Sequence, residues 1–165
     1  MAMSLDGYIA RAGGGHDWIP TDVDIDWDAF MARFDTVLMG RRSFEVMQRQ
    51  GSVGMAGMRT YVFSRTLDPA TLPSVTVIAE DAAEAIAALK REEGKEIWLF
   101  GGGILFGSLL EAGVVDVVEV AIVPVLLGQG IPLLPSLSHL QHLTLSGIRQ
   151  YDGGLVLLTY DVEVP

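Results

Sequence analysis

The chain has 165 residues, half of them hydrophobic, and a net charge of −10. This length predicts one domain spanning residues 1–165, with ample apolar material for a core. The acidic balance argues against a nucleic-acid partner, because phosphate binding depends on clustered Lys and Arg. Charges and glycines interrupt the apolar stretches before a membrane span is reached. With no cysteine and no leader pattern, we expect a cytoplasmic protein without disulfides or thiolate chemistry.

The positive charges are concentrated in one window. Between Gly40 and Arg65 the sequence has five arginines and a single acid, Glu45, a net charge of +4 within a chain whose total is −10. A compact basic patch on an acidic protein suits a small polyanion better than a long polymer. The alternative is a chance cluster of solvated arginines.

Strands and helices are expected to alternate along the chain. Residues 1–5 are expected to be the end of a first strand, short enough to suggest that residues before it were lost. Further strands are predicted at residues 36–39, 60–63, 75–78, 97–100 and 114–123. Helices are predicted to start near Ser43, to cover 82–93 after an Asp81 N-cap, and to cover 104–111.

The last part of the chain changes character. Residues 143–151 and 155–164 flank the turn Asp152-Gly153-Gly154, which predicts a hairpin. The fold class is therefore α/β: a mostly parallel central sheet with a C-terminal antiparallel hairpin and helices on both faces.

Three strand ends carry residues suited to binding an anion. These segments are Met39-Gly40-Arg41-Arg42-Ser43, Val62-Phe63-Ser64-Arg65 and Phe100-Gly101-Gly102-Gly103-Ile104. Glycines allow a phosphate to approach the backbone, and a helix N-terminus offers free N–H groups. The alternatives are surface turns with solvated arginines and a tight turn for helix packing. Phe106 stands three residues after Gly103, so the dinucleotide fingerprint of a Rossmann fold is not matched.

Metal chemistry is not expected. His139 and His142 lack an accompanying carboxylate cluster. The alternating acids Asp22, Asp24, Asp26 and Asp28 lack the glycine and terminal glutamate of a calcium loop.

Read together, six segments resemble the dihydrofolate reductase superfamily. They are residues 6–10, 18–19, 35–45, 63–65, 97–103 and 115–130. The greater similarity is to the branch found as the C-terminal reductase domain of bacterial riboflavin biosynthesis proteins.

The resemblance implies NADPH as the cofactor. It implies that Gly40, Arg41, Arg42 and Ser43 hold the 2′-phosphate and pyrophosphate side, and that Ser64 and Arg65 grip the 2′-phosphate. It places Gly101, Gly102, Gly103, Ile104 and Leu105 under the pyrophosphate, with a cis peptide bond at Gly101–Gly102. It brings Ala2 and Ile9 near the nicotinamide ring. The resemblance and the apolar segments 114–123 and 125–134 also predict a homodimer.

The substrate side rests on fewer residues. Asp26 precedes Phe30 by four residues, the spacing of the carboxylate and aromatic ring that contact the pterin in dihydrofolate reductases. Asp26 is thus the candidate catalytic acid, with Trp18 and Phe30 on the substrate. Asp24 and Asp28 compete for that role, and all three suit a solvated helix start. We expect a 5-amino-6-(5-phosphoribosylamino)uracil reductase-like enzyme with a small-molecule substrate. The alternatives are a dihydrofolate reductase and a non-catalytic NADP-binding module.

Overall fold

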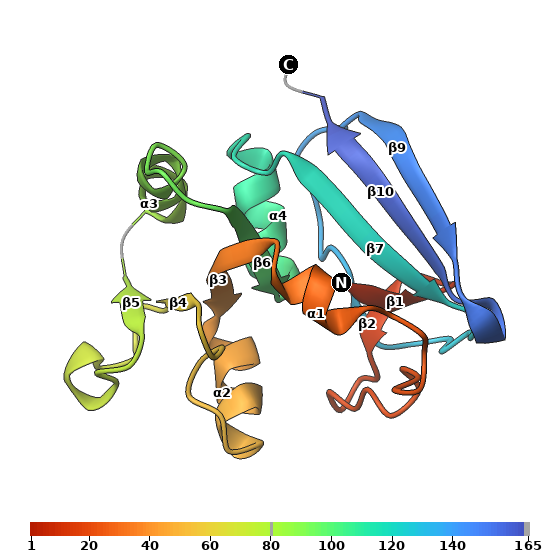
Figure 1. Cartoon of the computed structure of the whole chain (residues 1–165), viewed down its shortest axis with the longest axis horizontal. Coiled ribbons are helices and arrows are strands. Elements are labelled where there is room, and N and C mark those ends of the chain that lie inside the picture. Colours follow the sequence, from red (N-terminus) through yellow and green to blue (C-terminus); the bar gives the residue numbers. More distant parts are fainter. Residues whose placement is uncertain (80, 164–165) are drawn as a thin grey trace. The chain divides into compact units, whose positions relative to one another are not determined.

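The computed structural model describes residues 1–79 and 81–163. The chain divides into two compact units, one of Met1–Ile25 with Val115–Pro165 and one of Asp26–Val114. Hydrogen bonds group the described strands into three sheets (Figure 1). Strands and helices thus share the chain, as the α/β prediction requires.

The unit Asp26–Val114 is built on a parallel sheet in the order β5-β4-β3-β6. Its strands are β3 (Phe34–Gly40), β4 (Arg59–Phe63), β5 (Thr76–Ile78) and β6 (Glu96–Gly101). Its α-helices are α1 (Trp27–Met31), α2 (Arg41–Arg49), α3 (Ala82–Leu89) and α4 (Gly103–Glu111), with a 3-10 helix η1 (Pro69–Thr71).

The central strand β3 is apolar and buried from Val37 to Met39 because helices cover both faces of this sheet. Phe44 and Met47 of α2 form a buried cluster with Val37, Met39 and Val62. Helices α3 and α4 lie on the other side of the sheet (Figure 1). The connection from β3 to β4 through α2 and the connection from β5 to β6 through α3 run across the sheet in opposite directions. Since such connections are right-handed, the two helices cover opposite faces.

Helix α3 ends at Leu89, four residues before the predicted end at 93. The Asp81 N-cap is confirmed, because its carboxylate accepts from the backbone N–H groups of Ala83 and Glu84. The segment after the helix makes tertiary contacts: Glu92 accepts a hydrogen bond from Arg59 of β4, and the Lys95 backbone N–H donates to Asp35 of β3. Local helix propensity could not reveal those partners.

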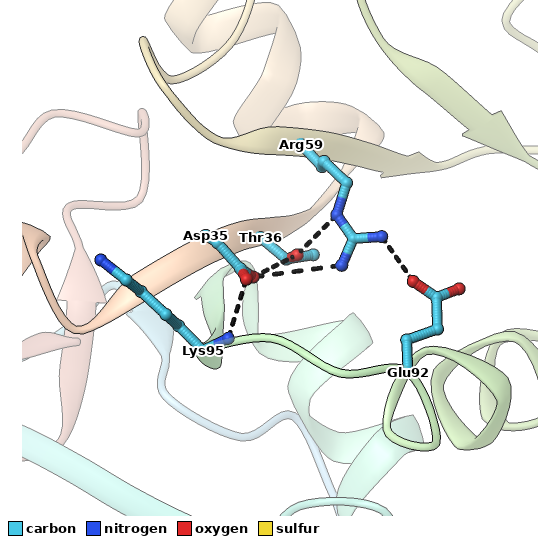
Figure 2. A network of polar contacts seen from close by, with 5 residues as sticks. All are labelled: Asp35, Thr36, Arg59, Glu92 and Lys95. Carbon is cyan, nitrogen blue, oxygen red and sulfur yellow. Dashed lines mark hydrogen bonds and ion pairs between the residues drawn. The ribbon is translucent and has the colours of Figure 1, made fainter.

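The amino edge of the parallel sheet is closed by a charge network (Figure 2). Asp35 accepts hydrogen bonds from the Lys95 backbone N–H and the Thr36 hydroxyl, both at 2.8 Å. Arg59 donates to Thr36 Oγ1 at 3.2 Å and to Glu92 at 2.5 Å. These bonds tie the first residues of β3 and β4 to the segment before β6.

The second unit contains a mixed sheet and a strand pair. The mixed sheet has the order β1-β7-β10-β9, made of β1 (Ala2–Ser4), β7 (Val117–Val123), β10 (Val156–Val162) and β9 (Leu143–Gln150). Strands β2 (Tyr8–Ala10) and β8 (Ile131–Pro132) form the pair. A 3-10 helix η2 (Asp152–Gly154) joins β9 to β10, which confirms the hairpin. Residue 164 of the predicted strand lies outside the described residues.

The apolar strand β7 is less available for association than its sequence suggested. Val118, Val120 and Val123 are buried, so they serve the core of the chain. Larger exposed apolar side chains occur in β9, where Leu145 is 47% and Ile148 is 66% exposed. Across residues 1–79 and 81–163, the helices are too short or too polar to traverse a bilayer.

Candidate nucleotide-binding site

The three predicted junctions lie together at the carboxyl edge of the parallel sheet. In the strand register, Gly40 at the end of β3 pairs with Phe63 of β4, and Met39 pairs with Gly101 of β6. After β3 the chain adds β4 and then β5 on one side of β3, and it later adds β6 on the other side. This reversal of strand order is the place where open α/β sheets bind ligands.

Two of the helices at this edge begin without a cap. Helix α2 has Gly40 as its N-cap and α4 has Gly102, and neither start has a side-chain cap bond or an acid in its first turn. By contrast, Asp26 caps α1 and Asp81 caps α3. The first N–H groups of α2 and α4 are therefore open to an anion, and both helix dipoles favour negative charge there.

The glycines at the starts of these helices lie close together. A Cβ on Gly40 would lie 3.8 Å from Leu105 Cβ and 3.9 Å from the backbone nitrogen of Gly102. A Cβ on Gly102 would lie 3.4 Å from Ser43 Oγ. The start of α2 thus packs closely against the start of α4. The Gly101–Gly102 peptide bond is cis, as expected.

The residues after Gly102 divide between core and solvent. Gly103 is buried as the first residue of α4, and Leu105 is buried beside Gly40. Ile104 is 67% exposed. Leu105 therefore packs against Gly40 at the start of α2, and Ile104 lies on the surface at the start of α4.

The predicted arginines differ in whether other side chains bind their guanidinium groups. Arg42 and Arg65 are exposed, and among residues 1–79 and 81–163 neither has a hydrogen-bond or ion-pair partner. Arg41 is engaged: its Nη1 donates to Thr66 Oγ1 at 2.9 Å and its Nε lies 3.4 Å from Glu45 Oε1. Two cations beside uncapped helix starts are therefore available to an anion.

Ser64 orders the loop that carries Arg65. Its Oγ accepts from the backbone N–H groups of Thr66 at 3.2 Å and Leu67 at 3.1 Å. The sequence reasoning missed Thr66 as the partner of Arg41. It also missed the pairing of Arg41 with Glu45, although the i,i+4 spacing was the signal for it.

The candidate catalytic acid has a structural role. The Asp26 carboxylate is exposed and accepts from the Ala29 backbone N–H at 2.9 Å, as the N-cap of α1. Asp28 lies in the first turn of the same helix, and Asp24 belongs to the other unit. The geometry therefore matches the helix-start alternative and leaves the second carboxylate oxygen of Asp26 for a substrate.

Phe30 belongs to an aromatic cluster on the unit Asp26–Val114. Its ring centroid lies 5.2 Å from that of Trp98 and 5.1 Å from that of Phe34, in edge-on contacts. Phe34 also stacks on Trp98. The cluster fixes the Phe30 ring.

Three predicted contacts belong to the other unit: Ala2 in β1, Ile9 in β2, and Trp18 in the loop after β2. The Trp18 indole N–H is buried and has no partner among the described residues. In the same unit, Asp6 accepts from the Gly128 N–H at 2.7 Å and from the Ser4 hydroxyl at 2.6 Å. These bonds, led by that of Ser4, lower the pKa of the Asp6 carboxyl. Asp6 thus pins the loop after β7 to the turn before Ile9.

Known proteins share this architecture. The Bacillus subtilis protein YwjB is 35% identical over 97% of this chain and 94% of its own. A Shewanella protein whose name places it in riboflavin biosynthesis is 26% identical, with a TM-score of 0.85 over 99% of this chain and 97% of that one.

Two more distant structures share the fold. The bifunctional deaminase and 5-amino-6-(5-phosphoribosylamino)uracil reductase of Thermotoga maritima has a TM-score of 0.72 at 19% identity, over 98% of this chain and 55% of that one. Enterococcus faecalis dihydrofolate reductase, in complex with NADP(H), has a TM-score of 0.67 at 19% identity, over 99% and 94%. The model of the RibD C-terminal domain matches residues 1–157. The chain therefore belongs to the RibD C-terminal domain family, with a dihydrofolate reductase-like fold.

Proposed function

We propose that this protein is an NADPH-dependent reductase that acts on a pyrimidine- or pterin-type substrate, resembling 5-amino-6-(5-phosphoribosylamino)uracil reductase in riboflavin-type metabolism. The observation that carries the proposal is the carboxyl edge of the parallel sheet. That edge has two helix starts without a side-chain cap, two closely packed glycines, and two arginines that have no partner among the described residues. Each of these features favours a phosphate-bearing ligand.

The features match the parts of a phosphorylated dinucleotide. The N–H groups at the starts of α2 and α4 suit a pyrophosphate, which needs several donors from the backbone. Arg42 and Arg65 suit an additional phosphate, because a guanidinium binds phosphate oxygens bidentately. Membership of the RibD C-terminal domain family and the fold shared with a dihydrofolate reductase bound to NADP(H) support the same cofactor.

The chain's own contribution to the reaction is binding and orientation. The cofactor supplies the hydride, and the protein holds the cofactor and the substrate together in a site that excludes water. Leu105 and the aromatic cluster around Phe30 provide rigid apolar surfaces in the unit Asp26–Val114. The free oxygen of the Asp26 carboxylate is the group we assign to orient or protonate the substrate.

The test measures binding and turnover separately. NADPH and NADH are titrated against the protein by calorimetry, and NADPH oxidation is then followed with the phosphoribosylaminouracil and with dihydrofolate. We expect NADPH to bind at least about tenfold more tightly than NADH, since one charge-assisted contact contributes roughly 1.5–3 kcal/mol. Turnover with the uracil derivative supports the proposal. If only dihydrofolate is turned over, the substrate assignment changes to dihydrofolate. Equal affinity for the two cofactors would refute the cofactor assignment.

A further inference from the structure

The three arginines predicted to hold phosphate are not equivalent, because among the described residues only Arg41 has side-chain partners. Its guanidinium lies 3.4 Å from the Glu45 carboxylate, one helical turn along α2, and donates to Thr66 at 2.9 Å. Both side chains of the ion pair are partly exposed, at 44% and 39%. Glu45 is also the single acid in the basic window from Gly40 to Arg65.

We infer that Glu45 is a specificity-determining residue that weakens the binding of the phosphate-bearing cofactor by occupying Arg41. This inference rests on the proposed function. The carboxylate takes the position of an anion on a cation that would otherwise face the ligand's extra phosphate. Binding that phosphate requires Arg41 either to leave Glu45 or to share its charge between two anions, and both options cost affinity.

The effect is confined to the extra phosphate. A cofactor without that group does not compete for Arg41, so Glu45 should leave its affinity unchanged. Arg42 and Arg65 have no carboxylate partner among the described residues, and the phosphate therefore meets two available cations and one engaged cation. In this way Glu45 moderates the preference for NADPH over NADH without removing it.

Thr66 connects Arg41 to the loop that carries Arg65. Its Oγ1 accepts from Arg41, and its backbone N–H donates to Ser64 Oγ. Arg41 thus joins the start of α2 to the loop after β4, where two of the predicted phosphate-binding segments meet. We assign Arg41 a positioning role in the cofactor-free protein, in addition to any contact with phosphate.

The experiment compares Glu45→Gln with Glu93→Gln in the full chain. Both substitutions remove one negative charge from the same unit, and Glu93 is exposed without a bonded partner among the described residues. NADPH and NADH dissociation constants are measured by calorimetry at low salt. Because exposed ion pairs are weak, we expect Glu45→Gln to tighten NADPH binding by about two- to fivefold and to leave NADH binding unchanged. Glu93→Gln should alter neither.

A second comparison tests whether the effect passes through Arg41. In an Arg41→Gln background, Glu45→Gln should no longer tighten NADPH binding. Persistence of the gain in that background, an equal gain for NADH, or no gain at all would overturn the inference. These outcomes differ from failure of the proposed function, in which the unmodified protein would not distinguish NADPH from NADH.

Discussion

The two edges of the parallel sheet in Asp26–Val114 use charge in opposite ways. At the amino edge, Arg59 pairs with both Asp35 and Glu92, and Asp35 accepts from the backbone N–H of Lys95 (Figure 2). At the carboxyl edge, the helix starts are uncapped, and Arg42 and Arg65 have no partner in the part of the chain that is described. The amino edge uses its charges in internal bonds, whereas the carboxyl edge leaves groups without internal bonds, and we propose that these groups bind the ligand.

The largest expected effect is at the carboxyl edge. Arg65→Ala should weaken NADPH binding by roughly ten- to a hundredfold, because a charge-assisted contact with phosphate contributes about 1.5–3 kcal/mol. NADH affinity should stay the same, and Arg42→Ala should behave similarly. Calorimetric titration of both cofactors measures the difference. Arg59→Gln is the matched control at the amino edge, and a loss of NADPH preference in that variant would break the comparison between the edges.

A pair of glycine substitutions should separate binding from folding. Gly40→Ala places a methyl group at least 3.8 Å from its neighbours, at an unstrained N-cap, so the free energy of unfolding should change by less than about 1 kcal/mol. The affinities for NADPH and NADH should fall together, because the methyl group adds bulk beside the backbone N–H groups proposed to bind the pyrophosphate.

At the opposite edge, Gly94→Ala places its Cβ 2.7 Å from Asp35 Oδ2. The carboxylate must move, so the free energy of unfolding should fall by about 1–3 kcal/mol while cofactor preference is retained. Urea unfolding and calorimetry on both glycine variants provide the measurements. Strong destabilisation by Gly40→Ala with normal cofactor affinity would show that Gly40 serves packing instead.

A smaller effect is expected from the Asp35 carboxyl and from pH. The Lys95 backbone N–H, followed by the Thr36 hydroxyl, lowers the pKa of Asp35 below its usual value. Its stabilising contribution is therefore complete above the unfolded-state pKa of about 3.9 and is lost as pH falls through the lower folded-state pKa. Asp35→Ala should lower the free energy of unfolding by about 1 kcal/mol at neutral pH, since the group is partly exposed. The difference in the free energy of unfolding between Asp35→Ala and the unmodified protein should become smaller below pH ~4. A difference that stays constant as the pH falls further would contradict this assignment.

The smallest effect on cofactor binding is expected from disrupting self-association, which we propose occurs through β9. Leu143, Leu145 and Ile148 are 40%, 47% and 66% exposed there, in a strand whose one charged residue is Arg149. Light scattering at micromolar concentration should give about twice the chain mass of 17.8 kDa. Ile148→Asp should shift the protein to monomers with NADPH affinity unchanged. A mass of 17.8 kDa for the unmodified protein would refute the dimer.

The sequence by itself determined where three strands end. Short apolar runs followed by Gly40, Ser64 and Gly101 indicated these junctions, because an apolar run marks a buried strand and the residues after it mark its end. The Asp81 cap and the Asp152-Gly153-Gly154 turn were equally local, since each depends on residues a few positions apart. The family resemblance added the cofactor, which these local patterns could not name.

Only the tertiary structure decided which polar groups are already satisfied. The i,i+4 spacing could indicate Glu45 as a partner of Arg41, but the sequence could not indicate Thr66, which lies 25 residues away and is brought close by the pairing of β3 with β4. It predicted four more residues for α3, and it gave no sign that Glu92 and Lys95 would bond to Arg59 and Asp35 of the sheet. Hydrogen bonds between residues distant in sequence depend on the strand order of the sheet, and that order has no local signature.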